Sequence, residues 1–213
     1  MIILDNYYKI KKVVDTLSNN TKIIAVTKNF SIEKINPLII EGHKDFGENK
    51  VQEATLKWAN ILKKYTDINL HLLGHLQSNK VSEAVNIFNY IHSLDSEKLA
   101  TKFMIEEKKR NKKLKYFIQI NIGEELQKFG ISIKETADFI SFCKNEAKLQ
   151  IIGLMCVPPV NKDSNYYFSQ LKELASSNDL FHLSMGMTLD YVEAINNGST
   201  YIRIGTGIFG ERL

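Results

Sequence analysis

The stretch that decides the fold is residues 181–207, which holds two glycine-marked turns, each after a short apolar run. The first reads Phe181-His182-Leu183-Ser184-Met185-Gly186-Met187, and the second reads Tyr201-Ile202-Arg203-Ile204-Gly205-Thr206-Gly207. Both pair a small hydroxyl residue with glycine where a strand is expected to end. Hydroxyls and unhindered backbone N–H groups at such turns suit a phosphate. In an eight-fold β/α barrel the loops after strands seven and eight are the usual phosphate site, so this stretch favours such a barrel.

On the N-terminal side of this stretch, short apolar runs alternate with amphipathic patterns along the rest of the chain. Strands that alternate with helices imply parallel pairing and right-handed crossovers. Eight such units predict an α/β fold, a single (β/α)8 TIM barrel that occupies residues 1–213 as one domain. The expected strands are Ile23–Thr27, Asp45–Gly47, Leu70–Gly74, Tyr90–Leu94, Tyr116–Ile122, Ile151–Val157, Phe181–Met185 and Tyr201–Ile204. The expected helices between them are Ser31–Glu41, Lys50–Lys63, Ser78–Phe88, Ser96–Lys109, Ser132–Glu146, Asn165–Ser176 and Thr188–Asn196.

The rival fold is a doubly wound open sheet. Eight strands would be many for that fold, and no Gly-x-Gly-x-x-Gly fingerprint follows the first strand. A helical pattern at about Tyr7–Leu17 precedes the first strand, and nothing helical is expected after the eighth. We therefore expect an extra N-terminal helix to cover the gap that a trailing eighth helix would fill, and we expect no C-terminal β domain.

The composition is that of an ordinary globular protein, with 44% hydrophobic residues, 24% charged residues and a net charge of +4. No apolar stretch reaches the ~20 residues that a membrane span needs. The lysine cluster at residues 108–115 is interpreted as a solvated helix end, because no nucleic-acid motif accompanies it. Cys143 and Cys156 are too few for a disulfide framework, which indicates a reduced, cytoplasmic protein.

Active sites of such barrels lie at the C-terminal ends of the strands, where two basic residues are expected. Lys28 follows Ile24 and Val26 at period two, at the mouth of the first strand, whereas Thr27 points away from that face. An apolar mouth disfavours an ammonium group, which suits Schiff-base chemistry. Arg203, on the eighth strand, is expected to point into the barrel and to need a partner there, because an unpaired buried charge is costly.

Metal binding is not expected. His71 and His75 have the spacing of a helical zinc pair, but they flank a stretch that reads as a strand and a turn. The residues alone thus predict a phosphorylated ligand held by an aldehyde-reactive lysine. Phosphosugar aldolases and isomerases fit the same description.

A set of motifs in a fixed order narrows this choice, and together they closely resemble the pyridoxal phosphate homeostasis protein family. The resemblance runs from about Ile23 to the C-terminus. The motifs are Ala25-Val26-Thr27-Lys28, Phe46-Gly47-Glu48-Asn49-Lys50-Val51-Gln52-Glu53, Gly74-His75-Leu76-Gln77-Ser78-Asn79-Lys80, His92-Ser93-Leu94-Asp95, Gly153-Leu154-Met155, Leu183-Ser184-Met185-Gly186-Met187 and Arg203-Ile204-Gly205-Thr206-Gly207-Ile208-Phe209-Gly210.

The resemblance implies a barrel related to the N-terminal domain of alanine racemase, which is PLP fold type III, with pyridoxal 5'-phosphate (PLP) as the cofactor. It implies that Lys28 forms a Schiff base with PLP, that Arg203 faces the pyridine nitrogen and that Asn49 lies near the ring substituents. The cofactor phosphate is implied to lie against Ser184, Met185, Gly205 and Thr206.

The resemblance also implies a role in intracellular PLP (vitamin B6) homeostasis without significant turnover. An arginine cannot protonate the pyridine nitrogen, and the second domain that supplies racemases with an opposite-face base is not expected here. A weak PLP-dependent amino-acid racemase or decarboxylase is the alternative. The expected partners are PLP and PLP-dependent apoenzymes, with no nucleic acid or membrane. A monomer is expected because no partner is needed to complete the site.

Overall fold

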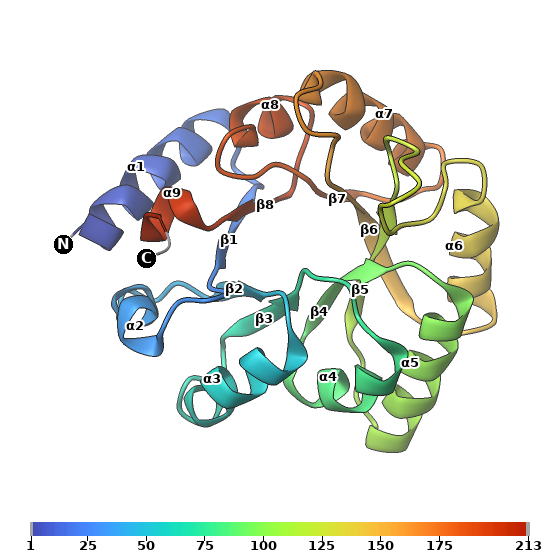
Figure 1. Ribbon diagram of the computed structural model, residues 1–213, viewed down its shortest axis with the longest axis horizontal. Coiled ribbons are helices and arrows are strands. Elements are labelled where there is room, and N and C mark those ends of the chain that lie inside the picture. Colours follow the sequence, from blue (N-terminus) through green and yellow to red (C-terminus); the bar gives the residue numbers. More distant parts are fainter. Residues whose placement is uncertain (1, 212–213) are drawn as a thin grey trace.

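The computed structural model describes residues 2–211, which form a closed barrel of parallel strands in the order β1 to β8, ringed by helices (Figure 1). This confirms the expected TIM barrel. The strands are β1 (Lys22–Val26), β2 (Asp45–Glu48), β3 (Asn69–Leu72), β4 (Tyr90–Leu94), β5 (Lys115–Ile120), β6 (Gln150–Cys156), β7 (His182–Ser184) and β8 (Tyr201–Ile204). The helices are α1 (Ile2–Leu17), α2 (Ile32–Ile40), α3 (Val51–Lys64), α4 (Val81–Ile87), α5 (Glu97–Arg110), α6 (Thr136–Asn145), α7 (Ser164–Ser176), α8 (Tyr191–Asn196) and α9 (Thr206–Phe209), with a 3-10 turn η1 (Ser78–Lys80) before α4.

Side chains alternate between the barrel interior and the outer shell, as they must on a strand. In β1, Ile24 packs inside the barrel with Tyr90, Phe117 and Tyr201. The next residue, Ala25, belongs to the shell between the strands and the helices. This alternation decides which polar residues face the interior and which face the helices.

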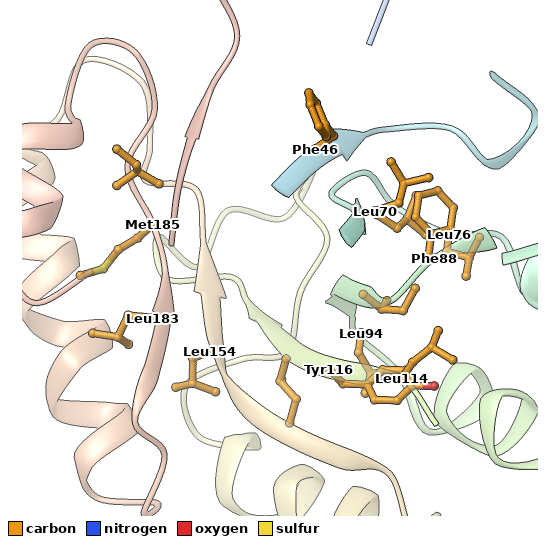
Figure 2. Close-up of a cluster of buried hydrophobic side chains, with 14 of the residues drawn as sticks. Phe46, Leu70, Leu76, Phe88, Leu94, Leu114, Tyr116, Leu154, Leu183 and Met185 are labelled. Carbon is orange, nitrogen blue, oxygen red and sulfur yellow. The ribbon is translucent and has the colours of Figure 1, made fainter. Parts of the chain in front are cut away.

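The shell holds most of the apolar core, and Figure 2 shows part of it around Phe46, Leu70, Tyr116, Leu154 and Leu183. All five side chains are buried. Burial of each large apolar side chain contributes about 1.5–3 kcal/mol, so the shell fixes the strands against the helices. Within residues 2–211, no helix is long and apolar enough to cross a membrane.

Two helices, α1 and α9, cover the strands β1 and β8 where the barrel closes, whereas the sequence predicted α1 alone. The expectation that nothing helical follows the eighth strand is wrong, because α9 forms one turn that packs against α1 (Figure 1). The Asn6 side chain donates to the carbonyl of Ile208 at 3.2 Å. A Cβ on Gly207 would lie 3.2 Å from Ile10, so the absence of a side chain permits this approach. As expected, α1 occupies the outer ring between α8 and α2.

Candidate functional site

Lys28 lies in the turn directly after β1, at the C-terminal end of the barrel, and is half-buried. The strand ends at Val26, earlier than the Thr27 expected from sequence. The next residue, Asn29, has a left-handed backbone with φ of 63°. Asparagine tolerates this conformation better than most residues, so the chain turns sharply just beyond the lysine.

Both neighbours of Lys28 are anchored to carboxylates near α3. The Thr27 hydroxyl donates to Glu48 Oε1 at 2.6 Å, and the Asn29 N–H donates to Glu53 Oε1 at 2.6 Å. Lys57 links the two anchors, because its Nζ donates to the carbonyl of Thr27 at 2.7 Å and to both carboxylates at 2.9 Å. We call Glu48, Glu53 and Lys57 the α3 clamp. Thr27 thus points to the outer shell, as strand alternation predicts.

Glu48 is the buried centre of the α3 clamp, with no exposed side-chain surface. Its Oε1 also accepts from the Trp58 indole N–H at 2.9 Å, whereas Oε2 has no hydrogen-bond partner. A buried carboxylate is tolerated when it is paired and hydrogen-bonded, and removing a partner from such a pair typically costs 3–5 kcal/mol. The turn that presents Lys28 is therefore fixed from the outer shell.

Arg203 is buried inside the barrel, with 6% of its surface exposed. Its Nη1 donates to the carbonyl and the hydroxyl of Ser184 at 2.6 and 2.9 Å, and its Nη2 donates to the carbonyl of Cys156 at 2.9 Å. Within residues 2–211 no carboxylate pairs with it, so the expected partner proves to be neutral oxygen atoms. Burial lowers the pKa of the guanidinium from its usual value. Three of its five N–H groups make these bonds, which leaves two for a ligand.

A chain of hydrogen bonds continues from Ser184 through the barrel interior. The Ser184 hydroxyl lies 2.8 Å from His92 Nδ1, His92 Nε2 lies 2.9 Å from His71 Nδ1, and His71 Nε2 lies 3.1 Å from Asp45 Oδ1. Burial lowers the pKa of His71, and burial together with the nearby His71 and Arg203 lowers the pKa of His92 strongly. Both imidazoles are therefore neutral near pH 7.

The glycine-marked turns after β7 and β8 lie side by side. Thr206 Oγ1 donates to Thr188 Oγ1 at 3.3 Å, and the Gly207 N–H donates to the same atom at 3.2 Å. Gly186 has φ of +92°, and a Cβ there would lie 2.5 Å from Ala194, so this turn requires glycine. The exposed Thr206 hydroxyl and the half-buried Thr188 hydroxyl thus lie next to glycine backbone; of these two, the sequence predicted Thr206.

The turn after β8 also lies against β1. A Cβ on Gly205 would be 3.5 Å from the carbonyl of Val26, two residues before Lys28. Asn49 follows β2, and its carbonyl would be 2.4 Å from a Cβ on Gly74. The fold therefore brings Lys28, Asn49, Gly205 and Thr206 to one end of the barrel.

Two of the predicted phosphate ligands use their polar groups elsewhere. The Ser184 hydroxyl bonds His92 and Arg203. Met185 donates its backbone N–H to the carbonyl of Tyr201 at 3.2 Å, and its side chain is buried in the shell (Figure 2). Contact of Ser184 and Met185 with a phosphate stays a prediction, as do the other ligand roles.

The two histidines with zinc-like spacing do not come together. His71 is fully buried and bonds Asp45, whereas His75 is exposed, lies 3.1 Å from Asp95 and stacks on Phe129. No group of three or more metal-ligating side chains occurs within residues 2–211.

Several groups at this end had no role in the sequence analysis, above all the α3 clamp, His92 and Thr188. Period-two spacing could have indicated that His71 and His92 face the interior, because His71 lies between Leu70 and Leu72 and His92 follows Ile91 on short strands. The α3 clamp gives no such signal, since it depends on how a helix docks against two strand ends.

Comparison with known proteins identifies the family of this chain. Residues 3–213 match the family model described as the N-terminal domain of alanine racemase. The chain is 37% identical over 211 residues to the pyridoxal phosphate homeostasis protein of Synechocystis, a match that covers 95% of this chain and 96% of the relative. The protein of the same name from Pasteurella multocida is 36% identical over 201 residues, covering 90% and 86%.

Solved structures extend the comparison. PipY of Synechococcus elongatus with PLP bound is 32% identical, has a TM-score of 0.87 and covers 98% of this chain and 100% of that one. An alanine racemase of Clostridium difficile is 14% identical with a TM-score of 0.79, covers 99% of this chain and 57% of the racemase, and shows a shared fold alone. With its closed barrel and these relatives, the chain belongs to the pyridoxal phosphate homeostasis protein family, whose barrel is that of the N-terminal domain of alanine racemase.

Proposed function

We propose that this protein binds PLP at the C-terminal end of its barrel and serves in PLP homeostasis. The observation that carries the proposal is the convergence of the Lys28 turn with the two hydroxyl-bearing turns after β7 and β8. PipY, which shares the family and the fold, was solved with PLP bound. A phosphate, a pyridine nitrogen and an aldehyde need anion ligands, a hydrogen-bond donor and an amine, and this end of the barrel offers all three.

We propose that different residues bind the aldehyde, the ring and the phosphate of the cofactor. Lys28 supplies the amine that bonds covalently to the cofactor aldehyde, the one chemical reaction that PLP contributes here. Arg203 directs its remaining N–H donors at the pyridine nitrogen, and Asn49 contacts the ring substituents. The backbone N–H groups of Gly205 and Thr206 and the Thr206 hydroxyl bind the phosphate, with Ser184 and Met185 beside it.

We propose that the bound cofactor is held without turnover of amino acids. Arg203 can donate a hydrogen bond to the ring but cannot give it a proton, which leaves the ring a poor electron sink. Within residues 2–211, no tyrosine lies in a loop that follows a strand, so no loop tyrosine is placed there to act as the opposite-face base. General base catalysis contributes roughly 10²–10⁴-fold, and that factor is missing.

The proposal extends to partners and location. A monomer suffices, because every residue of the site comes from one chain. PLP-dependent apoenzymes are the receivers proposed for the cofactor. Cys143 and Cys156 are both buried and unpaired, which supports a reducing compartment such as the cytoplasm.

The test is titration of the purified apoprotein with PLP, followed by equilibrium dialysis and by a turnover assay. We expect micromolar or tighter binding of PLP and much weaker binding of pyridoxal, which lacks the phosphate. Alanine, serine and other amino acids should show no Cα proton–deuterium exchange at a metabolic rate. Median enzymes turn over at about 10 per second, and exchange near that rate would identify a racemase instead. Absence of PLP binding would contradict the proposed function itself.

A further inference from the structure

The chain of hydrogen bonds inside the barrel crosses it almost from end to end. It joins side chains of five strands, from Asp45 at the start of β2 through His71, His92 and Ser184 to Arg203. Its four contacts measure 3.1, 2.9, 2.8 and 2.9 Å. The three middle members have no exposed surface, so water does not interrupt the chain.

The chemistry of the two ends fixes the direction of every bond. A carboxylate such as Asp45 only accepts, so His71 donates from Nε2. A neutral His71 then presents a bare Nδ1, to which His92 donates from Nε2. The bare Nδ1 of His92 accepts from the Ser184 hydroxyl. The serine oxygen is left to accept from Arg203, which only donates.

Aromatic rings pack against each of the two imidazoles and restrict their rotation. His71 stacks on Tyr90 with ring centroids 4.3 Å apart, and His92 stacks on Phe117 at 4.3 Å. Tyr201 lies edge-on to His92. Rings that cannot turn keep their nitrogen atoms aimed at the same partners, and burial favours the neutral form of both histidines.

We propose that His92 is a positioning residue for Arg203. Asp45 and His71 fix the tautomer of His92, and the Ser184 hydroxyl links His92 to Arg203. In this arrangement the serine oxygen always faces the guanidinium as an acceptor. Successive aligned bonds also polarise one another, so the negative end of the chain stabilises a cation that has no carboxylate beside it. Arg203 is thereby held in the one orientation that leaves two donors for the cofactor. The cofactor part of this inference rests on the proposed function.

The experiment uses the full-length apoprotein labelled with 15N in histidine and arginine. Ring nitrogen shifts distinguish protonated from bare nitrogen, so we expect Nε2 protonated and Nδ1 bare in both His71 and His92. Restricted rotation of the Arg203 guanidinium should give separate Nη1 and Nη2 signals. A proton on Nδ1 of His92 in the wild-type protein would overturn the proposal.

A matched pair of substitutions separates positioning from simple space filling. Asparagine and leucine are nearly equal in shape, but only the asparagine oxygen can accept from His92. His71→Asn should keep the wild-type tautomer of His92, whereas His71→Leu should shift the proton to Nδ1 and move the Arg203 Nη1 signal, because Nη1 bonds the Ser184 hydroxyl. His182→Leu removes another histidine from the barrel interior that is not in the chain, and it should change neither. Identical His92 spectra in the two His71 variants would contradict the proposal.

PLP affinity supplies the second readout. His71→Leu should weaken binding roughly two- to tenfold, the range of one neutral hydrogen bond, and His71→Asn should stay close to wild type. Should His71→Leu fail to fold, Ser184→Ala replaces it, because loss of the hydroxyl should also move the Arg203 Nη1 signal. If wild-type protein binds no PLP, the proposed function fails, while the apoprotein spectra still decide whether His92 positions Arg203.

Discussion

The two basic residues of the site are held in opposite ways. Lys28 lies in a turn, and the residues on either side of it, Thr27 and Asn29, are held from outside the barrel by the charged α3 clamp. Arg203 is fixed from inside the barrel by neutral oxygen atoms and by a chain of neutral imidazoles. The position of Lys28 therefore depends on helix docking, whereas the position of Arg203 depends on the barrel interior. Substitutions can therefore impair one without the other.

The largest effect is expected at the centre of the α3 clamp. Glu48→Ala leaves Lys57 and the Trp58 indole without a shared acceptor in the buried shell. We expect a loss of about 3–5 kcal/mol in the free energy of unfolding, measured by urea denaturation. Glu83→Ala, at an exposed pair with Lys80, is the control and should change stability by less than about 1 kcal/mol. Equal effects would show that the clamp does not hold the turn.

The next effect distinguishes two threonines. Thr206 is proposed to bind the phosphate, whereas Thr27 donates to Glu48 of the α3 clamp. Thr206→Val should weaken PLP binding by about 1.5–3 kcal/mol, the contribution of one hydrogen bond to a charged group. Thr27→Val should leave PLP affinity close to wild type and lower stability instead, because its hydroxyl serves Glu48. Equilibrium dialysis and urea denaturation of both variants provide the comparison. Equal losses of PLP affinity would mean that the phosphate binds elsewhere.

A smaller effect should appear in the pH dependence of stability. Burial holds the pKa of His71 and His92 below the unfolded value of about 6.5, so the unfolded chain binds protons that the folded barrel excludes. This stability is present above pH ~6.5 and is lost as the pH falls toward the folded pKa values. Each histidine adds a slope of up to about 1.4 kcal/mol per pH unit.

His92→Asn tests this slope, because it keeps an acceptor for Ser184 but cannot titrate. Unfolding free energies measured between pH 5 and 6.5 should fall less steeply with acidity than in the wild type. The pKa of Asp45 concerns a lower pH range. Burial would raise it, but the hydrogen bond from His71 holds it below its usual value, so its contribution is lost only in more acidic solution, below pH ~4. An unchanged slope would show that His92 is charged or exposed in the folded protein.

The sequence was sufficient to predict the barrel and to predict that Lys28 and the two glycine-marked turns lie at the same end of it. Strand alternation placed Thr27 outward and Arg203 inward, and glycine with hydroxyl residues indicated the two turns that meet through Thr188 and Thr206. These features depend on neighbours within a few residues. The helix α9 was missed because its single turn is stabilised by packing against α1, at the other end of the chain.

The support of the site could not be predicted in the same way. The chain from Asp45 to Arg203 crosses five strands, and the register between strands decides which side chains meet. The α3 clamp likewise depends on the docking angle of a helix. For Ser184, the sequence indicated a phosphate ligand, while its hydroxyl is bonded to Arg203 and His92 inside the barrel. Local sequence patterns do not predict such contacts, because the partners lie far apart in the chain.

Borohydride reduction of the PLP-loaded protein shows whether Lys28 is the residue that bonds PLP. Peptide mapping should place the reduced adduct on the peptide that contains Lys28, and Lys28→Ala should abolish the adduct while leaving micromolar PLP binding through the phosphate contacts. Lys50→Ala, an exposed lysine beside Asn49, should retain the adduct. An adduct on Lys50 or Lys80 in the wild-type protein, or one that survives in Lys28→Ala, would contradict the account.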